Sequence, residues 1–140
     1  FRASGNYTYI GLFHPAFLKH PVENIQTVPV LSQYHKPGGI VVNAMTQPGE
    51  TDHYSVEDHV DAICHHAFAD AVDIVVANNC CFSQSILDKY NAMGSTPVVL
   101  REKRHPYIVM ERDLINTQQQ LVRHDSQKVK EVVEEILRMP

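Results

Sequence analysis

The sequence predicts an α/β fold, a three-layer, doubly wound domain with a mainly parallel, Rossmann-like sheet. Short β-branched runs, continuous as in strands buried on both faces, alternate with longer segments whose apolar residues recur at helical spacing. This alternation is typical of parallel strands joined by right-handed helical crossovers. The chain has 140 residues. Because a domain usually has about 100 to 200 residues, we expect residues 1–140 to form a single domain.

The first clear strand is predicted over residues 40–43 and the next over 72–77, because both runs are apolar and rich in Val and Ile. Residues 1–38 contain four prolines and support no assignment of elements. Between the two strands, Ser55 stands three residues before Asp58, a spacing typical of the cap that opens a helix. A helix therefore joins the two strands, as a parallel pair requires.

In the second half of the chain, a helix is predicted to begin at Ser83 or Ser85 and to end at Gly94. The last helix, capped by Asp125 or Ser126, has the clearest apolar stripe. Three further strands are predicted from short apolar runs at residues 97–100, 107–110 and 121–123.

Composition excludes several classes of protein. The chain has 12 Lys and Arg against 16 Asp and Glu, for a net charge of −4, and a nucleic-acid-binding module would normally be basic. No run approaches the ~18 apolar residues of a membrane span. Three cysteines, with Cys80 next to Cys81, do not make a disulfide framework, so a reducing compartment is expected. The first residue is Phe1, and we interpret the chain as processed or as a fragment.

Ligands of parallel sheets bind beyond the carboxyl ends of the strands. This rule points to the loops after Asn43 and Ala77 and to the strand end at Arg123. The first of these loops gathers hydrogen-bonding groups at Thr46, Gln47, Gly49, Glu50, Thr51 and Asp52. Such donors and acceptors suit a polyol, a ribose or the edge of a nucleobase. The alternative is a solvated turn that leads into a capped helix.

Arg123 is the second candidate, because its planar guanidinium can donate two parallel hydrogen bonds to a phosphate. The alternative is a charged loop in which Asp125 only caps the last helix. No metal site is expected, since His59 and His66 lie seven residues apart on one helix, His65 is next to His66, and neither spacing is the i, i+4 pair of a zinc-protease helix. No nucleophile motif and no obvious acid–base pair of carboxylates is present, so the sequence favours binding over catalysis.

Residues 42–60 resemble the signature of the YvcK/CofD-like family, which includes the gluconeogenesis factors. The family pattern reads N-x-M-T-Q-P-G-E-T-D-G-Y, followed by D-H a few positions later. Residues 73–78 are similar to its D-x-V-x-x-N strand end, and residues 123–126 to its R-H-D-[ST] entry to the last helix. The resemblance extends over about residues 40–137 and implies a cytoplasmic bacterial protein with a CofD-like fold.

The resemblance implies two alternative functions. The YvcK branch is a regulator that binds UDP-N-acetylglucosamine without turnover and affects cell shape and carbon metabolism. The CofD branch is a 2-phospho-L-lactate transferase of coenzyme F420 biosynthesis, which would require Mg²⁺. The run from Thr46 to Asp52 favours the first branch. Transferred by position, the ligand-binding residues are Asn43, Thr46, Gln47, Gly49, Glu50, Thr51, Asp52, Asn78 and Arg123.

Ser126 takes the place where the family often has a threonine open to phosphorylation. His53 stands where the family has glycine, which is expected to narrow the pocket or to change the turn. The glycine-rich phosphate loop of the family has no counterpart in this chain. The chain therefore resembles the carboxyl-terminal part of a longer CofD-like domain, which binds part of the ligand or, without the phosphate loop, has lost the function. Formation of a homo-oligomer stays open.

Overall fold

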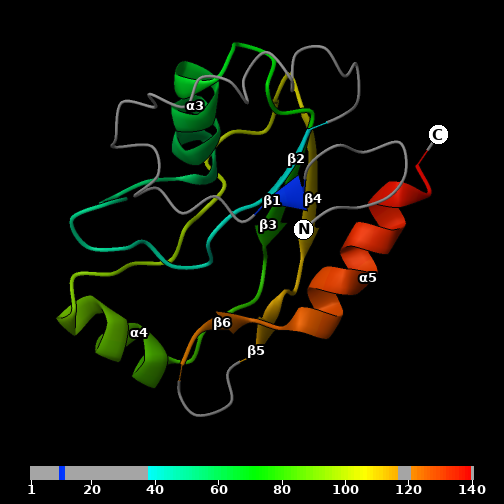
Figure 1. Ribbon diagram of the computed structural model, residues 1–140. Coiled ribbons are helices and arrows are strands. Elements are labelled where there is room, and N and C mark those ends of the chain that lie inside the picture. Colours follow the sequence, from blue (N-terminus) through cyan, green and yellow to red (C-terminus); the bar gives the residue numbers. More distant parts are fainter. Residues whose placement is uncertain (1–9, 12–37, 117–120, 140) are drawn as a thin grey trace.

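The computed structural model describes residues 10–11, 38–116 and 121–139. It contains a four-stranded sheet whose neighbouring strands are all parallel (Figure 1). The strands follow one another in chain order: β1 (Ile10–Gly11), β2 (Gly39–Val41), β3 (Ile74–Asn78) and β4 (Ile108–Arg112). The parallel sheet predicted from the sequence is confirmed. Most of the proline-rich segment over residues 1–38, and thus part of the predicted single domain, lies outside the described residues.

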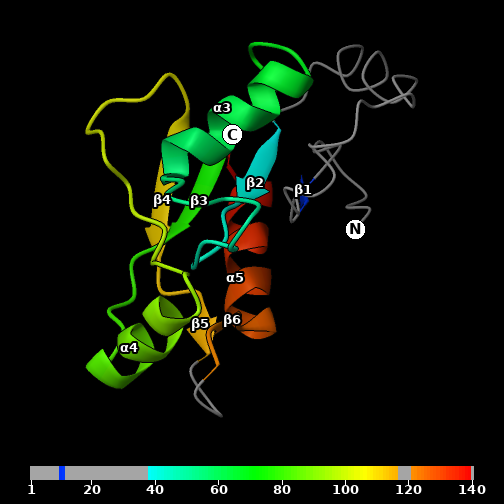
Figure 2. The same cartoon turned by 90° about the vertical axis from the view of Figure 1, so that its left-hand side faces the viewer.

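Helices cover both faces of the sheet, which confirms the three-layer arrangement (Figures 1 and 2). Side chains alternate between the two faces along a strand. Val41 and Val76 belong to a cluster that includes residues of α5 (Ser126–Leu137). Their neighbours Ile40 and Val75 belong to a second cluster, which includes residues of α3 (Val56–His66). The continuous apolar runs of the sequence are thus explained by burial on both faces.

The helix that joins β2 to β3 begins as predicted. The Ser55 hydroxyl accepts a hydrogen bond from the Asp58 backbone N–H at 3.2 Å, and the Asp58 carboxylate accepts one from the Ser55 N–H at 2.7 Å. This reciprocal pair satisfies two N–H groups that the first turn would otherwise leave unpaired. Ser55 is also almost fully buried, so water cannot replace its hydroxyl.

Replacing Ser55 with alanine is expected to lower the free energy of unfolding by about 1 to 2 kcal/mol, because the cap is lost at a buried position. Ser83 is the matched control, since it precedes α4 (Gln84–Ala92) without a side-chain cap hydrogen bond, and Ser83→Ala should change stability by less than about 0.5 kcal/mol. Urea unfolding of both variants measures the difference. Equal losses would contradict the role of the capping box.

Helix α4 confirms the second predicted helix, and Gly94 lies just past its end with a φ of 78°. Left-handed backbone of this kind favours glycine, which has no Cβ to clash. The last helix is also confirmed: Asp125 accepts hydrogen bonds from the backbone N–H groups of Gln127 and Lys128 at 2.9 and 3.1 Å. No helix in the described part of the chain has both the length and the apolarity to cross a membrane.

The strand predicted over residues 97–100 is wrong. Within the described residues this segment makes only an isolated bridge, from Pro97 to Met45. The Val98 N–H donates to the Ala44 carbonyl, and the Val99 carbonyl accepts from the Val56 N–H, both at 3.0 Å. The run therefore crosses the loop after β2 and the start of α3, and its apolar character reflects burial there rather than a place in the sheet.

The strand predicted over residues 121–123 is shorter and shifted. It is β6 (Arg123–His124), which pairs with β5 (Ile115–Asn116) in an antiparallel ribbon separate from the main sheet. No strand was predicted at β5. The ribbon and α4 both lie at the end of the molecule where β3 and β4 finish (Figure 1). That end is the carboxyl edge, where the predicted ligand-binding loops should meet.

Candidate functional site

The loop after β2 is shaped by its own hydrogen bonds. Thr51 is fully buried, and its hydroxyl accepts from the Gln47 backbone N–H at 2.8 Å. The Asp52 carboxylate accepts from the Gly49 N–H, with its nearer oxygen at 2.9 Å. Thr51 and Asp52, both predicted to bind ligand, thus use side-chain oxygens to form the turn. Gln47 and Glu50 are half-buried and Gly49 is exposed at the surface of this turn.

The same loop is fastened to the segment that follows α4. The Thr46 hydroxyl accepts from the Thr96 backbone N–H at 2.8 Å, and the Thr46 N–H donates to the Thr96 carbonyl at 2.7 Å. The Ser95 hydroxyl donates to the Thr46 carbonyl. Thr46 is therefore a buried joint between two loops, and its partners at Ser95 and Thr96 were not identified from the sequence.

His53 has a left-handed backbone conformation, with a φ of 62°. A side chain in this left-handed region is strained by contact between its Cβ and the backbone. The His53 side chain is exposed, and its carbonyl accepts a hydrogen bond from the Arg101 guanidinium at 2.9 Å.

Replacing His53 with glycine should raise the free energy of unfolding by about 0.5 to 1 kcal/mol, because relief of the strain outweighs the greater freedom of glycine in the unfolded chain. Gly94 offers the matched opposite change. Its φ of 78° makes Gly94→Ala destabilising by about 1 kcal/mol. Thermal or urea unfolding tests both, and a loss of stability in His53→Gly would contradict the strain.

Asn78 lies at the carboxyl end of β3 and connects the segments that follow β3 and β4. Its Oδ1 atom accepts from the Leu114 backbone N–H at 3.2 Å. Its Nδ2 atom donates to the Cys80 carbonyl at 3.5 Å. Both polar atoms of this predicted ligand-binding residue therefore have partners within the protein, which supports a structural role.

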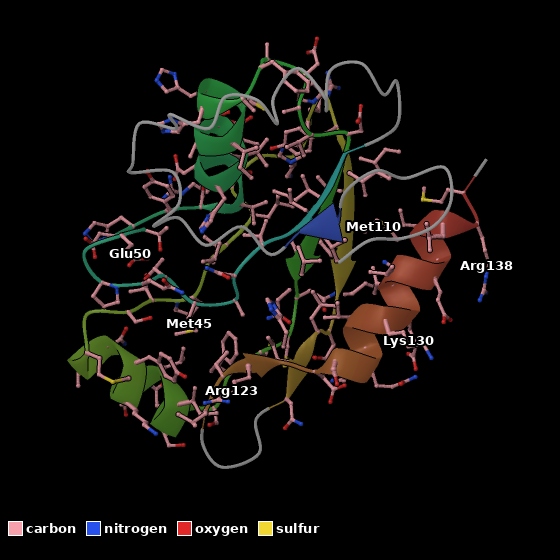
Figure 3. All side chains as sticks on the ribbon, in the orientation of Figure 1. Met45, Glu50, Met110, Arg123, Lys130 and Arg138 are labelled. Carbon is pink, nitrogen blue, oxygen red and sulfur yellow. The ribbon has the colours of Figure 1, made fainter. Side chains whose placement is uncertain are left out.

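Arg123 lies on β6, at the same edge of the sheet as the loop after β2 (Figures 1 and 3). Its side chain is exposed. The Val122 N–H donates to the Tyr90 hydroxyl at 2.8 Å, which joins the ribbon to α4. The backbone of Val42 acts on the ring of His124 by raising its pKa against the larger effect of burial, so the ribbon approaches the end of β2. The three predicted segments therefore lie at one edge of the sheet, although they are far apart in sequence.

Asp125 caps α5, as expected if this charged loop only opens the last helix. Ser126 is the exposed first residue of that helix. The nearest cation, Lys128, already contacts Asp113 at 2.7 Å. The hydrogen bond from Lys128 lowers the pKa of the Asp113 carboxyl. Arg123 was predicted from the sequence to bind an anion, and its side chain is exposed. It is therefore the cation at this end of the ribbon that is better suited to this role.

Two polar atoms near this edge are buried without a hydrogen-bond partner, Asn43 Nδ2 and His124 Nε2. Burial lowers the pKa of His124, so the ring is neutral at pH 7. Asn43 was predicted to bind ligand, whereas His124 appeared only within the R-H-D motif. Beyond that motif the sequence contained no signal for it. Among the residues described, no three His, Cys, Asp or Glu side chains are grouped so that they could hold a metal ion.

Comparison with known proteins identifies relatives over most of the chain. A family described as 2-phospho-L-lactate transferase CofD matches residues 22–138. A candidate gluconeogenesis factor of Aquifex aeolicus is 42% identical over 100 residues, which are 69% of this chain and 30% of the relative. The gluconeogenesis factor of Bacillus subtilis is 33% identical over 101 residues, or 70% of this chain and 32% of its own length.

The fold has a counterpart in a crystal structure of a UPF0052 family member from Bacillus halodurans. The two share 28% identity with a TM-score of 0.70, over 76% of this chain and 35% of that protein. The chain thus spans about a third of the length of the curated relatives it matches. From its match over residues 22–138 and from these relatives, we conclude that the chain belongs to the CofD-like family and corresponds to the carboxyl-terminal part of its gluconeogenesis factor members.

Proposed function

We propose that this chain forms part of a binding site for a nucleotide sugar, UDP-N-acetylglucosamine, in a cytoplasmic regulatory protein of the gluconeogenesis factor type. The observation that carries the proposal is the convergence of three polar segments at the carboxyl edge of a parallel sheet. Ligands of such folds bind at this edge. Relatives that bear the name gluconeogenesis factor support a role in carbon metabolism, and an effect on cell shape is part of the same proposal.

The contacts between the loops favour a preformed site. Thr46 joins the loop after β2 to Thr96, Asn78 joins the end of β3 to Leu114, and Tyr90 joins α4 to the ribbon. Loops held in this way lose little conformational freedom when a ligand binds, which favours affinity. We therefore assign a structural role, which fixes the loops around the site, to Thr46, Thr51, Asp52 and Asn78.

The remaining predicted ligand-binding residues divide by chemistry. The exposed Arg123 guanidinium suits the diphosphate, because its fork matches two phosphate oxygens. The side chains of Gln47 and Glu50 suit hydroxyl and amide groups of the sugar or base, whereas the Gly49 N–H already donates to Asp52. A phosphate so close to the Asp125 carboxylate needs a cation to offset the like charge, which is a further reason to assign it to Arg123.

Calorimetric titration of the full-length protein with UDP-N-acetylglucosamine tests the proposal. We expect saturable binding with one site per chain and much weaker binding of ATP, which lacks both the uracil and the N-acetylglucosamine. Absence of heat or of a thermal shift at millimolar ligand would contradict it.

The second candidate function is the 2-phospho-L-lactate transferase, favoured by the description of the matched family over residues 22–138. This reaction would require Mg²⁺, which proteins usually hold with one or two carboxylates together with substrate phosphates. Mg²⁺-dependent consumption of a nucleotide-activated lactate by the full-length protein would establish this function. No consumption, together with binding of the nucleotide sugar, would exclude it.

Ser126 is proposed as a phosphorylation site. Its side chain is exposed in the first turn of α5, where the helix dipole favours a negative charge. Mass spectrometry of the protein from its native host should detect a phosphopeptide that contains Ser126. Detection of the unmodified peptide alone, under the growth conditions tested, would contradict the assignment.

A further inference from the structure

The segment between α4 and β4 contacts the loop after β2 at both ends of that loop. At the start of the loop, the Thr96 N–H donates to the Thr46 hydroxyl at 2.8 Å, and the Thr96 carbonyl accepts from the Thr46 N–H at 2.7 Å. At the far end, the Arg101 guanidinium donates to the His53 carbonyl at 2.9 Å. Residues 95–101, which are not among the proposed ligand contacts, therefore hold that loop from outside.

Arg101 joins the end of the loop to the helix that follows it. Nη2 of Arg101 donates to the His53 carbonyl, and Nη1 donates to the Asp58 carboxylate at 3.2 Å. The same oxygen of Asp58 accepts from the Ser55 N–H in the capping box of α3. A planar guanidinium can hold two acceptors at a fixed angle, as an ammonium group cannot. Arg101 therefore fixes the direction of the His53 carbonyl relative to the first turn of α3.

The backbone of Arg101 is itself anchored on α3. Glu57 Oε1 accepts from the backbone N–H groups of Arg101 and Glu102, at 2.9 and 2.8 Å. The Arg101 side chain is 56% exposed, so its ion pair with Asp58 contributes little to stability by itself. The anchored backbone strengthens the contact with His53, because less conformational freedom is lost when the guanidinium binds the carbonyl.

His53 is the residue at which this contact has most effect. Its φ of 62° lies in the left-handed region, which strains any residue other than glycine. Strained backbone persists only where its surroundings hold it. A rotation of His53 out of this region would turn the preceding residues, among them Gln47 and Glu50, relative to α3. The hydrogen bond from Arg101 to the His53 carbonyl opposes that rotation.

We propose that Arg101 is a positioning residue, which holds the loop after β2 in the orientation that binds the ligand and does not contact the ligand itself. Both of its terminal nitrogens already donate to acceptors within the protein. The inference rests on the proposed nucleotide-sugar function and extends it, because it assigns the orientation of Gln47 and Glu50 to a residue outside their loop.

Arg101→Ala should weaken binding of UDP-N-acetylglucosamine by the full-length protein about 3- to 10-fold, because only a fraction of the molecules then presents the loop in the binding orientation. The melting temperature of the ligand-free protein should change by no more than about 2 °C, since the side chain is exposed. Arg104→Ala, at another exposed arginine of the same connection, is the matched control and should bind as the wild type does.

A double-mutant cycle with His53→Gly tests whether Arg101 acts through the strained backbone. Glycine adopts the left-handed region without strain, so the loop depends less on the contact. We expect Arg101→Ala to weaken binding by less than about 2-fold in the His53→Gly protein. An equal fold-loss in the two backgrounds would mean that the two residues act independently, and would overturn the inference.

The salt dependence of binding distinguishes positioning from contact. Arg123→Ala is expected to lower it, whereas Arg101→Ala should leave it as in the wild type, because no contact with phosphate is lost. A salt dependence lowered by Arg101→Ala would show that this guanidinium contacts the ligand, and the inference would then be wrong.

Two further results would also overturn it. Unchanged affinity in Arg101→Ala, with binding intact in the wild type, would overturn the inference and leave the proposed function standing. Failure of the wild-type protein to bind the nucleotide sugar would overturn the proposed function and the inference together.

Discussion

Leu114→Ala is expected to lower the free energy of unfolding by about 2 to 5 kcal/mol, the range for a buried leucine that leaves a cavity. Leu114 has no exposed surface and packs in the cluster between the sheet and α5. Its backbone also joins two elements: the N–H donates to Asn78, and the carbonyl accepts from the Asp125 N–H at 2.7 Å. A cavity here should therefore loosen both the end of β3 and the start of α5.

The control for this variant is Ile108→Ala on β4. Ile108 also lies on a strand of the main sheet, but half of its surface is exposed, so the loss should stay below about 1.5 kcal/mol. Urea unfolding measures both free energies on the same protein background. A Leu114→Ala variant as stable as Ile108→Ala would show that this cluster does not support the carboxyl edge.

Arg123→Ala should weaken binding of UDP-N-acetylglucosamine about 10- to 100-fold, because a charge-assisted hydrogen bond to phosphate is lost. The folded protein should be unaffected, since the side chain is exposed. Arg123→Lys keeps the charge but not the planar fork, so its affinity should lie between those of the wild type and the alanine variant.

Arg138→Ala is the matched control. Arg138 is an exposed arginine at the far end of α5 (Figure 3), so its loss removes the same charge away from the edge. Calorimetry at two salt concentrations should show a smaller salt dependence for Arg123→Ala than for Arg138→Ala, because the phosphate contact is screened by ions. Equal affinity in the two variants would mean that Arg123 does not contact the ligand.

Elements whose signals are local could be predicted from the sequence. The cap at Ser55, the left-handed Gly94 and the apolar stripe of the last helix depend on residues within a few positions of one another. The continuous apolar runs at β2 and β3 also predicted strands, because burial on both faces removes the need for polar alternation.

Elements defined by distant partners could not be predicted in the same way. Residues 97–100 have the composition of a buried strand, but their backbone bonds to Ala44 and Val56 rather than to the sheet. The short strand β5 is recognised only by its pairing with β6 across the intervening residues. The composition of an apolar run does not show which backbone it will pair with. The sequence of residues 97–100 therefore predicts burial but not a place in the sheet.

In the candidate site, too, local features could be predicted from the sequence and contacts between distant residues could not. The sequence placed the polar groups of residues 46–52 in one loop, and the rule for parallel sheets placed Arg123 at the same edge. It could not show that Thr51 and Asp52 bond within the loop, because a polar side chain that binds ligand and one that shapes a turn have the same composition.

One nucleotide sugar is proposed to bind at the carboxyl edge, between the loop after β2 and the β5–β6 ribbon. A crystal structure of the full-length protein with UDP-N-acetylglucosamine is the decisive experiment. We expect the diphosphate within hydrogen-bonding distance of the Arg123 guanidinium, and the sugar or base against residues 46–52. A nucleotide bound elsewhere, with Arg123 in solvent and this loop unoccupied, would contradict it.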